Sequence, residues 1–527
     1  MPQRMRLNDE NRKWWTLAAM CFALFMIMLD NTVVNVALPS IQDDLGASLS
    51  ALEWTVNAYT LTFAVLLVTG GRLGDIYGRR RMFLFGVVVF AISSAAIGLA
   101  PTQGWLVAGR ALQGIGAAFM MPGTLSIISN TFPPEERGRA IGTWAGVSAL
   151  ALALGPVVGG ALAEHVSWRA IFFLNLPVAA GAVAVTLFAT RESYDRTVAR
   201  SVDIPGIATI SIGLTALVLA LVEGNQWGWA SAEILALWAT AVVSLAAFVL
   251  VELHGKRPMV EFAYFRSRSF LGANAVAFIV SFAMLAMFFF MALYMQNILG
   301  YSPLEAGIRF LPSTVVIMVV APIAGRLADR IGPRPLMASG LAFAAIALFM
   351  QSRVTIDTTY PDLLASFSLM GLGMGLTMSP MSTAAMNSVS PDKAGAASGI
   401  LSMFRMIGGT FGVAAIGALF QSLAHDRATT AAQAAGVPSS MQHELVENLG
   451  SGRADEIARQ LDPAAAEQLT RGMHEAFVHA LGGALTLSAI VAAAGSVIAL
   501  VLVERKSALR KTDPARHPEV VEPVGAQ

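Results

Sequence analysis

The sequence contains a single cysteine, Cys21, and few charged residues. One cysteine excludes an internal disulfide and a metal site built from several thiolates. Charged residues make up 13% of the 527 positions, about half of the roughly 25% that soluble domains carry. None of the seven histidines lies near the middle of a predicted membrane span, which argues against a histidine proton relay. The net charge of +1 gives no indication of a nucleic-acid partner.

Long apolar runs dominate the chain instead. Only helices and closed barrels span lipid, and barrel strands are about ten residues long with alternating polarity. The first run is too long for a signal-peptide core, so we interpret it as a retained span. The sequence therefore predicts an all-α membrane protein with fourteen spans. They lie near 14–38, 52–71, 82–100, 103–127, 139–163, 169–190, 204–223, 231–251, 270–297, 306–325, 335–352, 361–387, 397–423 and 474–503.

Basic residues alternate with the spans in a way that predicts orientation. If the N-terminus is cytoplasmic, most of the 35 Lys and Arg residues fall in inner segments. This bias is the positive-inside rule, and it favours an even number of spans with both termini in the cytoplasm. The predicted location is the inner or plasma membrane.

An internal repeat indicates the architecture. The segment from Gly71 to Arg79, with Asp75 and Gly78, recurs 254 residues later with Gly325 and Asp329. Parallel six-helix repeats are typical of transporters. We therefore predict a six-helix bundle over 1–190, a two-helix insert with linkers over 191–269, a second six-helix bundle over 270–503 and a cytoplasmic tail over 504–527.

A polar segment over 424–473 forms an outer loop in this topology. One interpretation is a solvated amphipathic hairpin. The others are a lid over the outer cavity and a docking surface for an envelope adaptor.

Two opposite charges lie inside spans at similar depth. Asp30 precedes Pro39 by nine residues and Arg110 follows Pro101 by nine, so each lies about 13 Å from the outer end of its span. A buried ionisable group is a functional candidate by default. Burial favours the neutral carboxyl and a guanidinium favours the carboxylate, which suits reversible proton binding. The alternative is a fixed ion pair that holds two helices together. We expect both side chains to face one central cavity.

Other polar and aromatic side chains near the outer halves of spans are candidates for an adaptable substrate cavity. These are Asn31, Asn35, Asn57, Tyr59, Gln113, Phe289, Tyr294, Gln296 and Asn297. Glycine-rich segments within spans indicate close helix approach rather than nucleotide binding. No ATP site, metal-ligand cluster or nucleophile motif is visible in the sequence, so no cofactor is expected and an ion gradient is the predicted energy source.

Several motifs together resemble the major facilitator superfamily, in particular its fourteen-span drug:proton antiporters. Segments 29–39 and 168–177 resemble two hallmarks of that subfamily. The 71–80 segment resembles the superfamily's loop motif, in which the acid and a nearby arginine latch the cytoplasmic side. Arg110 with Gln113 resembles a span 4 motif linked to proton transfer. Gly155, Pro156, Gly159 and Gly160 resemble the antiporter motif of span 5.

The resemblance implies a major facilitator fold and a function. It implies a secondary antiporter that exports lipophilic, often cationic small molecules in exchange for protons, with Asp30 as the main protonation site and Arg110 tuning it. One alternative is a dedicated exporter of one endogenous compound, such as an antibiotic, a siderophore or a lipid. A remote alternative is a membrane sensor that transports nothing. No feature of the sequence supports an enzyme.

Overall fold

The structure is a computed structural model, and it describes residues 8–46, 49–195, 203–255, 258, 260–438 and 462–504. Within these ranges the regular structure is entirely helical, and fourteen helices are long and apolar enough to cross a membrane. The prediction of an all-α chain with fourteen spans is confirmed. The fourteen are α1 (Asp9–Leu45), α2 (Leu49–Tyr77), α3 (Arg79–Gly98), α4 (Gln103–Thr131), α5 (Pro134–His165), α6 (Trp168–Ala189), α7 (Ile204–Trp227), α8 (Ala232–His254), α9 (Arg268–Asn297), α11 (Leu311–Ile331), α12 (Pro333–Gln351), α13 (Tyr360–Asn387), α14 (Ala394–Ala434) and α17 (Pro463–Leu502).

Short elements and caps explain where several spans begin. The hydroxyl of Thr102 accepts the Trp105 N–H at the start of α4, and Ser267 caps α9 in the same way. Such caps satisfy N–H groups that have no partner within the helix. Within the described ranges, three short helices lie between the spans: η1 (Phe262–Arg266), α10 (Pro303–Arg309) and η2 (Pro391–Lys393).

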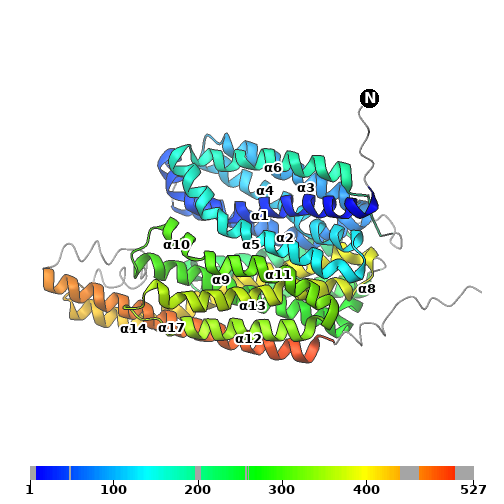
Figure 1. Cartoon of the computed structure of the whole chain (residues 1–527). Coiled ribbons are helices and arrows are strands. Elements are labelled where there is room, and N and C mark those ends of the chain that lie inside the picture. Colours follow the sequence, from blue (N-terminus) through cyan, green and yellow to red (C-terminus); the bar gives the residue numbers. More distant parts are fainter. Residues whose placement is uncertain are drawn as a thin grey trace, which may run out of the picture.

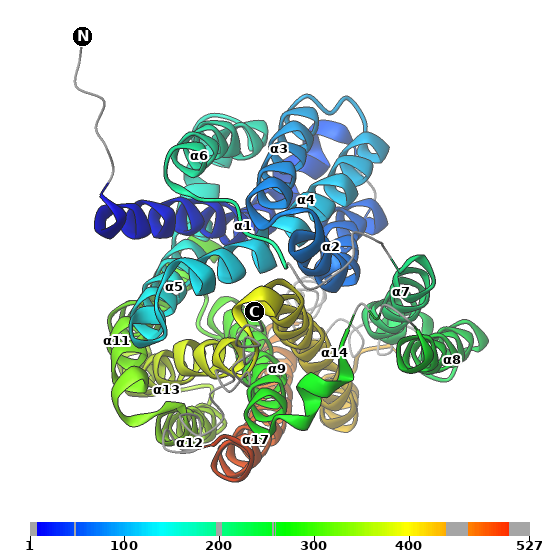
Figure 2. The same ribbon diagram turned by 90° about the vertical axis from the view of Figure 1, so that its right-hand side faces the viewer.

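The long helices form two groups of six with a separate pair beside them (Figure 2). Helices α1 to α6 pack on one another, and α9, α11 to α14 and α17 do the same. Helices α7 and α8 pack against each other, and α7 contacts α2 and α14. The two groups meet mainly where α5 crosses α11 and where α2 crosses α14.

The start of α1 and the end of α17 lie at the same end of the molecule, which we call the terminal end (Figure 1). At the opposite end, α14 and α17 run past the predicted span boundaries into the polar 424–473 segment. Ala428, Ala432, Leu469, Met473 and Ala476 form a buried seam between these extensions. Both ends of the segment are therefore helical rather than loop. Residues 439–461, including its central amphipathic pieces, lie outside the described residues.

Candidate functional site

Asp30 and Arg110 are in direct contact. Nη1 of Arg110 lies 2.6 Å from Oδ2 of Asp30. The amide of Gln113 donates to Oδ1 of Asp30 at 2.9 Å, and the amide of Asn175 donates to the same oxygen at 3.2 Å. Three residues from α4 and α6 thus converge on one carboxylate of α1, which has a hydrogen-bond donor at each oxygen.

Neighbouring helices complete the shell around the arginine. Its Nε donates to the backbone carbonyl of Thr55 at 3.0 Å, and its guanidinium carbon lies 4.2 Å from the ring centroid of Tyr59. Both are residues of α2. The hydroxyl of Ser94 on α3 accepts from the amides of Gln113 and Asn175. The cluster is therefore held by α1, α2, α3, α4 and α6, all from the first group of helices.

The cluster is enclosed rather than open to a central cavity. Asp30 is 2% exposed and Arg110 is 1% exposed. The expectation that the two charges lie at one level agrees with their direct contact, whereas their facing one central cavity stays a prediction, because the surrounding helices close over both side chains here. The two charges balance each other, and hydrogen bonds satisfy both carboxylate oxygens of Asp30.

This arrangement has a definite chemical consequence. Protonation of Asp30 would remove the charge that pairs with Arg110 and leave a buried cation without its counter-ion. A proton can therefore bind stably only if Asp30 and Arg110 separate or the site becomes hydrated.

The remaining cavity candidates are dispersed. Asn31 and Asn57 are partly exposed, and the side chain of Asn35 lies outside the described residues. On α9, Phe289 is 48% exposed, whereas Tyr294 is buried and donates its hydroxyl to the Thr355 carbonyl at 2.7 Å. Gln296 and Asn297 lie at the end of α9. Among the predicted cavity residues whose side chains are described, Gln113 and Tyr59 contact the Asp30–Arg110 pair.

Sequence reasoning missed three members of the cluster: Ser94, Asn175 and Thr55. Ser94 and Asn175 are polar residues inside apolar spans, and that is the signal that could have found them. Thr55 contributes only its backbone carbonyl, so no side-chain pattern could have identified it.

Two glycines of the span 5 motif lie against the helix that carries Asp30. A Cβ on Gly155 would collide with the Thr32 hydroxyl, and one on Gly159 would lie 3.0 Å from the Val33 carbonyl. The side chain of Pro156 is outside the described residues. The small residues therefore let α5 approach α1 two to three residues after Asp30.

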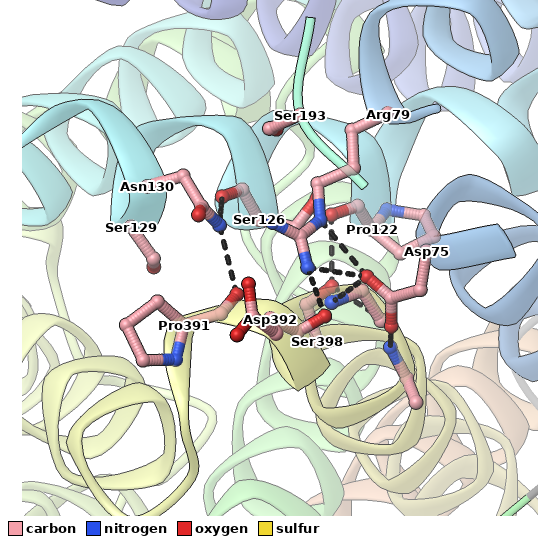
Figure 3. A network of polar contacts seen from close by, with 12 residues as sticks. Asp75, Arg79, Pro122, Ser126, Ser129, Asn130, Ser193, Pro391, Asp392 and Ser398 are labelled. Carbon is pink, nitrogen blue, oxygen red and sulfur yellow. Dashed lines mark hydrogen bonds and ion pairs between the residues drawn. The ribbon is translucent and has the colours of Figure 1, made fainter. Parts of the chain in front are cut away.

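A second buried ion pair, Asp75 with Arg79, joins the two groups of helices at the terminal end (Figure 3). Oδ1 of Asp75 accepts from Nε of Arg79 at 2.9 Å and from the Gly395 N–H at 2.9 Å. Oδ2 accepts from the Ala396 N–H at 2.7 Å. Asp75 of α2 thus caps the N-terminus of α14, where free N–H groups and the helix dipole favour a negative charge.

Further contacts surround this cap. Arg79 also donates to the Asp392 carbonyl at 2.5 Å, and Asn130 of α4 donates to the Pro391 carbonyl at 3.0 Å. The hydroxyl of Ser398 on α14 donates to the Pro122 carbonyl of α4 at 2.8 Å. Figure 3 shows these residues converging from α2, α3, α4, η2 and the start of α14. Gly78, with φ of +111°, makes the turn between α2 and α3, which no residue with a Cβ adopts readily.

The repeated motif, which contains Gly325 and Asp329, makes a related contact between α11 and α5. Asp329 of α11 accepts the Gly138 N–H of α5 at 3.1 Å. A Cβ on Gly325 would collide with the Gly138 carbonyl, just as one on Gly71 would collide with the Gly395 carbonyl. Two helix crossings, α2 with α14 and α5 with α11, are therefore backbone-to-backbone contacts. Pro333 and Pro335 interrupt the basic run that the first motif carries after its glycine.

We predict that Gly325→Ala weakens the contact between α5 and α11 at the terminal end, because the added methyl group would collide with the Gly138 backbone. A thiol introduced by Ser382→Cys, three residues after the Ser379 hydroxyl that donates to Gly138, reports the opening. Its maleimide labelling should accelerate several-fold in the Gly325→Ala background. Cys21 is buried, so it adds little background.

The control is Gly181→Ala, whose Cβ would meet nothing within 4 Å. This variant should leave labelling unchanged, since Ala in an open helix position is about 1 kcal/mol more favourable than Gly. Equal labelling rates in the two glycine variants would contradict the proposed role of the α5–α11 crossing.

The sequence matches the Major Facilitator Superfamily profile over residues 20–413. The chain belongs to the Major Facilitator Superfamily. It is 34% identical to the tetracenomycin C resistance and export protein of Streptomyces glaucescens, over 93% of this chain and 91% of that protein. It is 37% identical to the multidrug resistance protein Stp of Mycobacterium tuberculosis, over 77% of this chain and 75% of that protein.

Solved structures support the same fold. The proton:xylose symporter XylE aligns with a TM-score of 0.59 and 13% identity, covering 94% of this chain and 97% of that chain. At this identity the likeness shows the fold alone. Membership of the superfamily and fourteen apolar helices make the protein a multi-pass membrane protein of a transporter family.

Proposed function

We propose that this superfamily member is a proton-coupled antiporter that exports lipophilic small molecules from the cell. The enclosed Asp30–Arg110 pair is the observation that carries the proposal, because a buried carboxylate with a counter-ion couples proton binding to helix packing. Similarity to proteins named for drug resistance and export supports outward transport. Transport rather than catalysis is the proposed activity, with the proton gradient as energy source and no cofactor.

The proposed orientation places the terminal end in the cytoplasm. Positively charged segments gather at that end by the positive-inside rule. The Asp75–α14 and Asp329–α5 contacts then close the cytoplasmic side of a protein in the plasma membrane. In this scheme, substrate leaves to the outside while these contacts hold. Proton entry from outside then separates Asp30 from Arg110 and favours the opposite state.

A dedicated exporter of a single compound is the second candidate. One observation favours it: a relative that matches nearly the whole chain is named for one antibiotic, tetracenomycin C. A substrate panel separates the two, since a narrow profile favours the dedicated exporter. An envelope adaptor remains a proposed partner for the polar segment between α14 and α17.

The direct test uses inside-out vesicles that contain the full-length protein. Imposing a proton gradient should drive accumulation of ethidium or another lipophilic dye, and a protonophore should abolish it. Vesicles without the protein provide the baseline. Dye flux that persists at full rate with the protonophore present would refute proton coupling, and the absence of flux for a broad panel would favour a sensor.

A further inference from the structure

Arg405 of α14 differs from the other arginines that lie within the helical core. Arg79 and Arg110 pair with aspartates, and Arg137 donates to the Phe132 carbonyl and the Asn387 side chain. Arg405 lies twelve residues into α14 and is partly exposed, and its buried Nε has no hydrogen-bond partner within the described ranges. No carboxylate from those ranges forms an ion pair with it. An unpaired cation at this depth is costly, which indicates a role beyond packing.

The side chain lies on the face of α14 that meets the first group of helices. Arg405 follows Ser398 by seven residues, close to two full turns, so the two share a face. The Ser398 hydroxyl donates to the Pro122 carbonyl of α4 across the interface. Arg405 therefore faces the same interface about 10 Å farther from the terminal end.

The register between α14 and α2 gives the level of Arg405. These helices run antiparallel, with Gly395 against Gly71 and Gly399 against Leu67 and Val68. Six further residues along each helix bring Arg405 to the level of Leu61 along the helix axes. Leu61 also shares a face of α2 with Val68, seven residues away, and that face is the one in contact with α14.

An apolar pocket begins at this level. It has a volume of about 540 Å³ and lies between the outer halves of α2 and α4. Leu61, Thr62 and Ala111 line its inner end, and the Thr62 hydroxyl donates to the Ala111 carbonyl at 2.8 Å. Trp54 and Val107 line the part farther from the terminal end. This volume is within the range of small-molecule sites, roughly 300–1,000 Å³.

We propose that this pocket and Arg405 together form a binding site for lipophilic anions. The aromatic or aliphatic body of the ligand occupies the pocket, and its carboxylate, phenolate or sulfonate group pairs with the guanidinium at the inner end. Arginine suits this role because its planar donors match oxyanion geometry. The inference that such anions are transported rests on the proposed export function. The inference that they bind at this site does not depend on that function.

A matched pair of ligands tests the site on the purified full-length protein. 2-Naphthoate and 2-naphthamide have the same ring body and differ in the charged group, and calorimetry at pH 8 measures both. The wild-type protein should bind naphthoate at least about tenfold more tightly, since a charge-assisted hydrogen bond contributes that much. Arg405→Gln should remove this preference and leave naphthamide binding unchanged, and Arg405→Lys should keep part of it.

Two further variants separate the pocket from the charge. Leu61→Trp fills the pocket and should weaken both ligands. Arg471→Gln removes an exposed arginine that pairs with Glu475 and should change neither. Equal affinity for the two ligands in the wild-type protein would overturn the proposal, even if Arg405→Gln does not fold. Unchanged naphthoate affinity in a folded Arg405→Gln protein would also overturn it.

These experiments distinguish a failure of the proposed binding site from a failure of the proposed transport function. Calorimetry needs no proton gradient, so preferential naphthoate binding without dye flux would contradict the antiporter function and support the site. Gradient-driven flux of a cationic dye with no naphthoate preference would support the antiporter and refute the anion site.

Discussion

Replacing Asp30 by Asn should abolish proton-driven dye accumulation in inside-out vesicles, reducing it to the level seen with a protonophore. Asn retains the size of the side chain but cannot bind and release a proton. It also leaves Arg110 buried without its counter-ion, and breaking such a pair costs about 3–5 kcal/mol of folding stability. Lost flux in this variant alone therefore has two causes that must be separated.

The double variant Asp30→Asn with Arg110→Gln separates them. It removes both charges and retains side chains that can hydrogen-bond, so the melting temperature should recover most of its loss. Proton-driven flux should stay absent, because the protonation site is still missing. Wild-type coupling in the single variant would refute Asp30 as the coupling residue. Restored coupling in the double variant would assign the defect to stability.

Asp75→Asn should have the second largest effect, lowering transport at least tenfold and weakening closure of the terminal end. The substitution leaves the buried Arg79 without its counter-ion and removes the negative charge from the N-terminus of α14. The uncompensated guanidinium costs about 3–5 kcal/mol, and loss of the charge at the helix terminus adds up to about 1 kcal/mol. Labelling of the thiol introduced at Ser382 should accelerate, as for Gly325→Ala.

Asp329→Asn is the matched control for this prediction. Asp329 occupies the repeated position and accepts the Gly138 N–H, which lies within α5 rather than at its first turn. Its replacement should therefore weaken closure less than that of Asp75. Labelling at least as fast as in Asp75→Asn would show that the helix-terminus contact of Asp75 is not the principal closing interaction.

The sequence predicted the features that depend on local pattern. Apolar length predicted the fourteen spans, and distance from the flanking prolines predicted that Asp30 and Arg110 lie at one level. Enclosure of the pair was not predictable, because it depends on Ser94 and Asn175 from spans whose faces the sequence does not orient. The partner of Asp75 was equally hidden, since Gly395 and Ala396 contribute only backbone N–H groups from 320 residues away. The helical extensions of α14 and α17 pack through a seam of mostly alanine side chains that is buried only when the two helices pair.

The glycine crossings affect how fast the two groups of helices can separate and rejoin. Where Gly71 meets Gly395 and Gly138 meets Gly325, the two halves touch through main chain that has no side-chain rotamers to order. Ordering a long side chain costs as much as about 2 kcal/mol, and ordering glycine adds no side-chain entropy. A seam of this kind separates and rejoins without a search through side-chain conformations. An interface that must open and shut once for every molecule moved gains from being made of the residues with the least to rearrange.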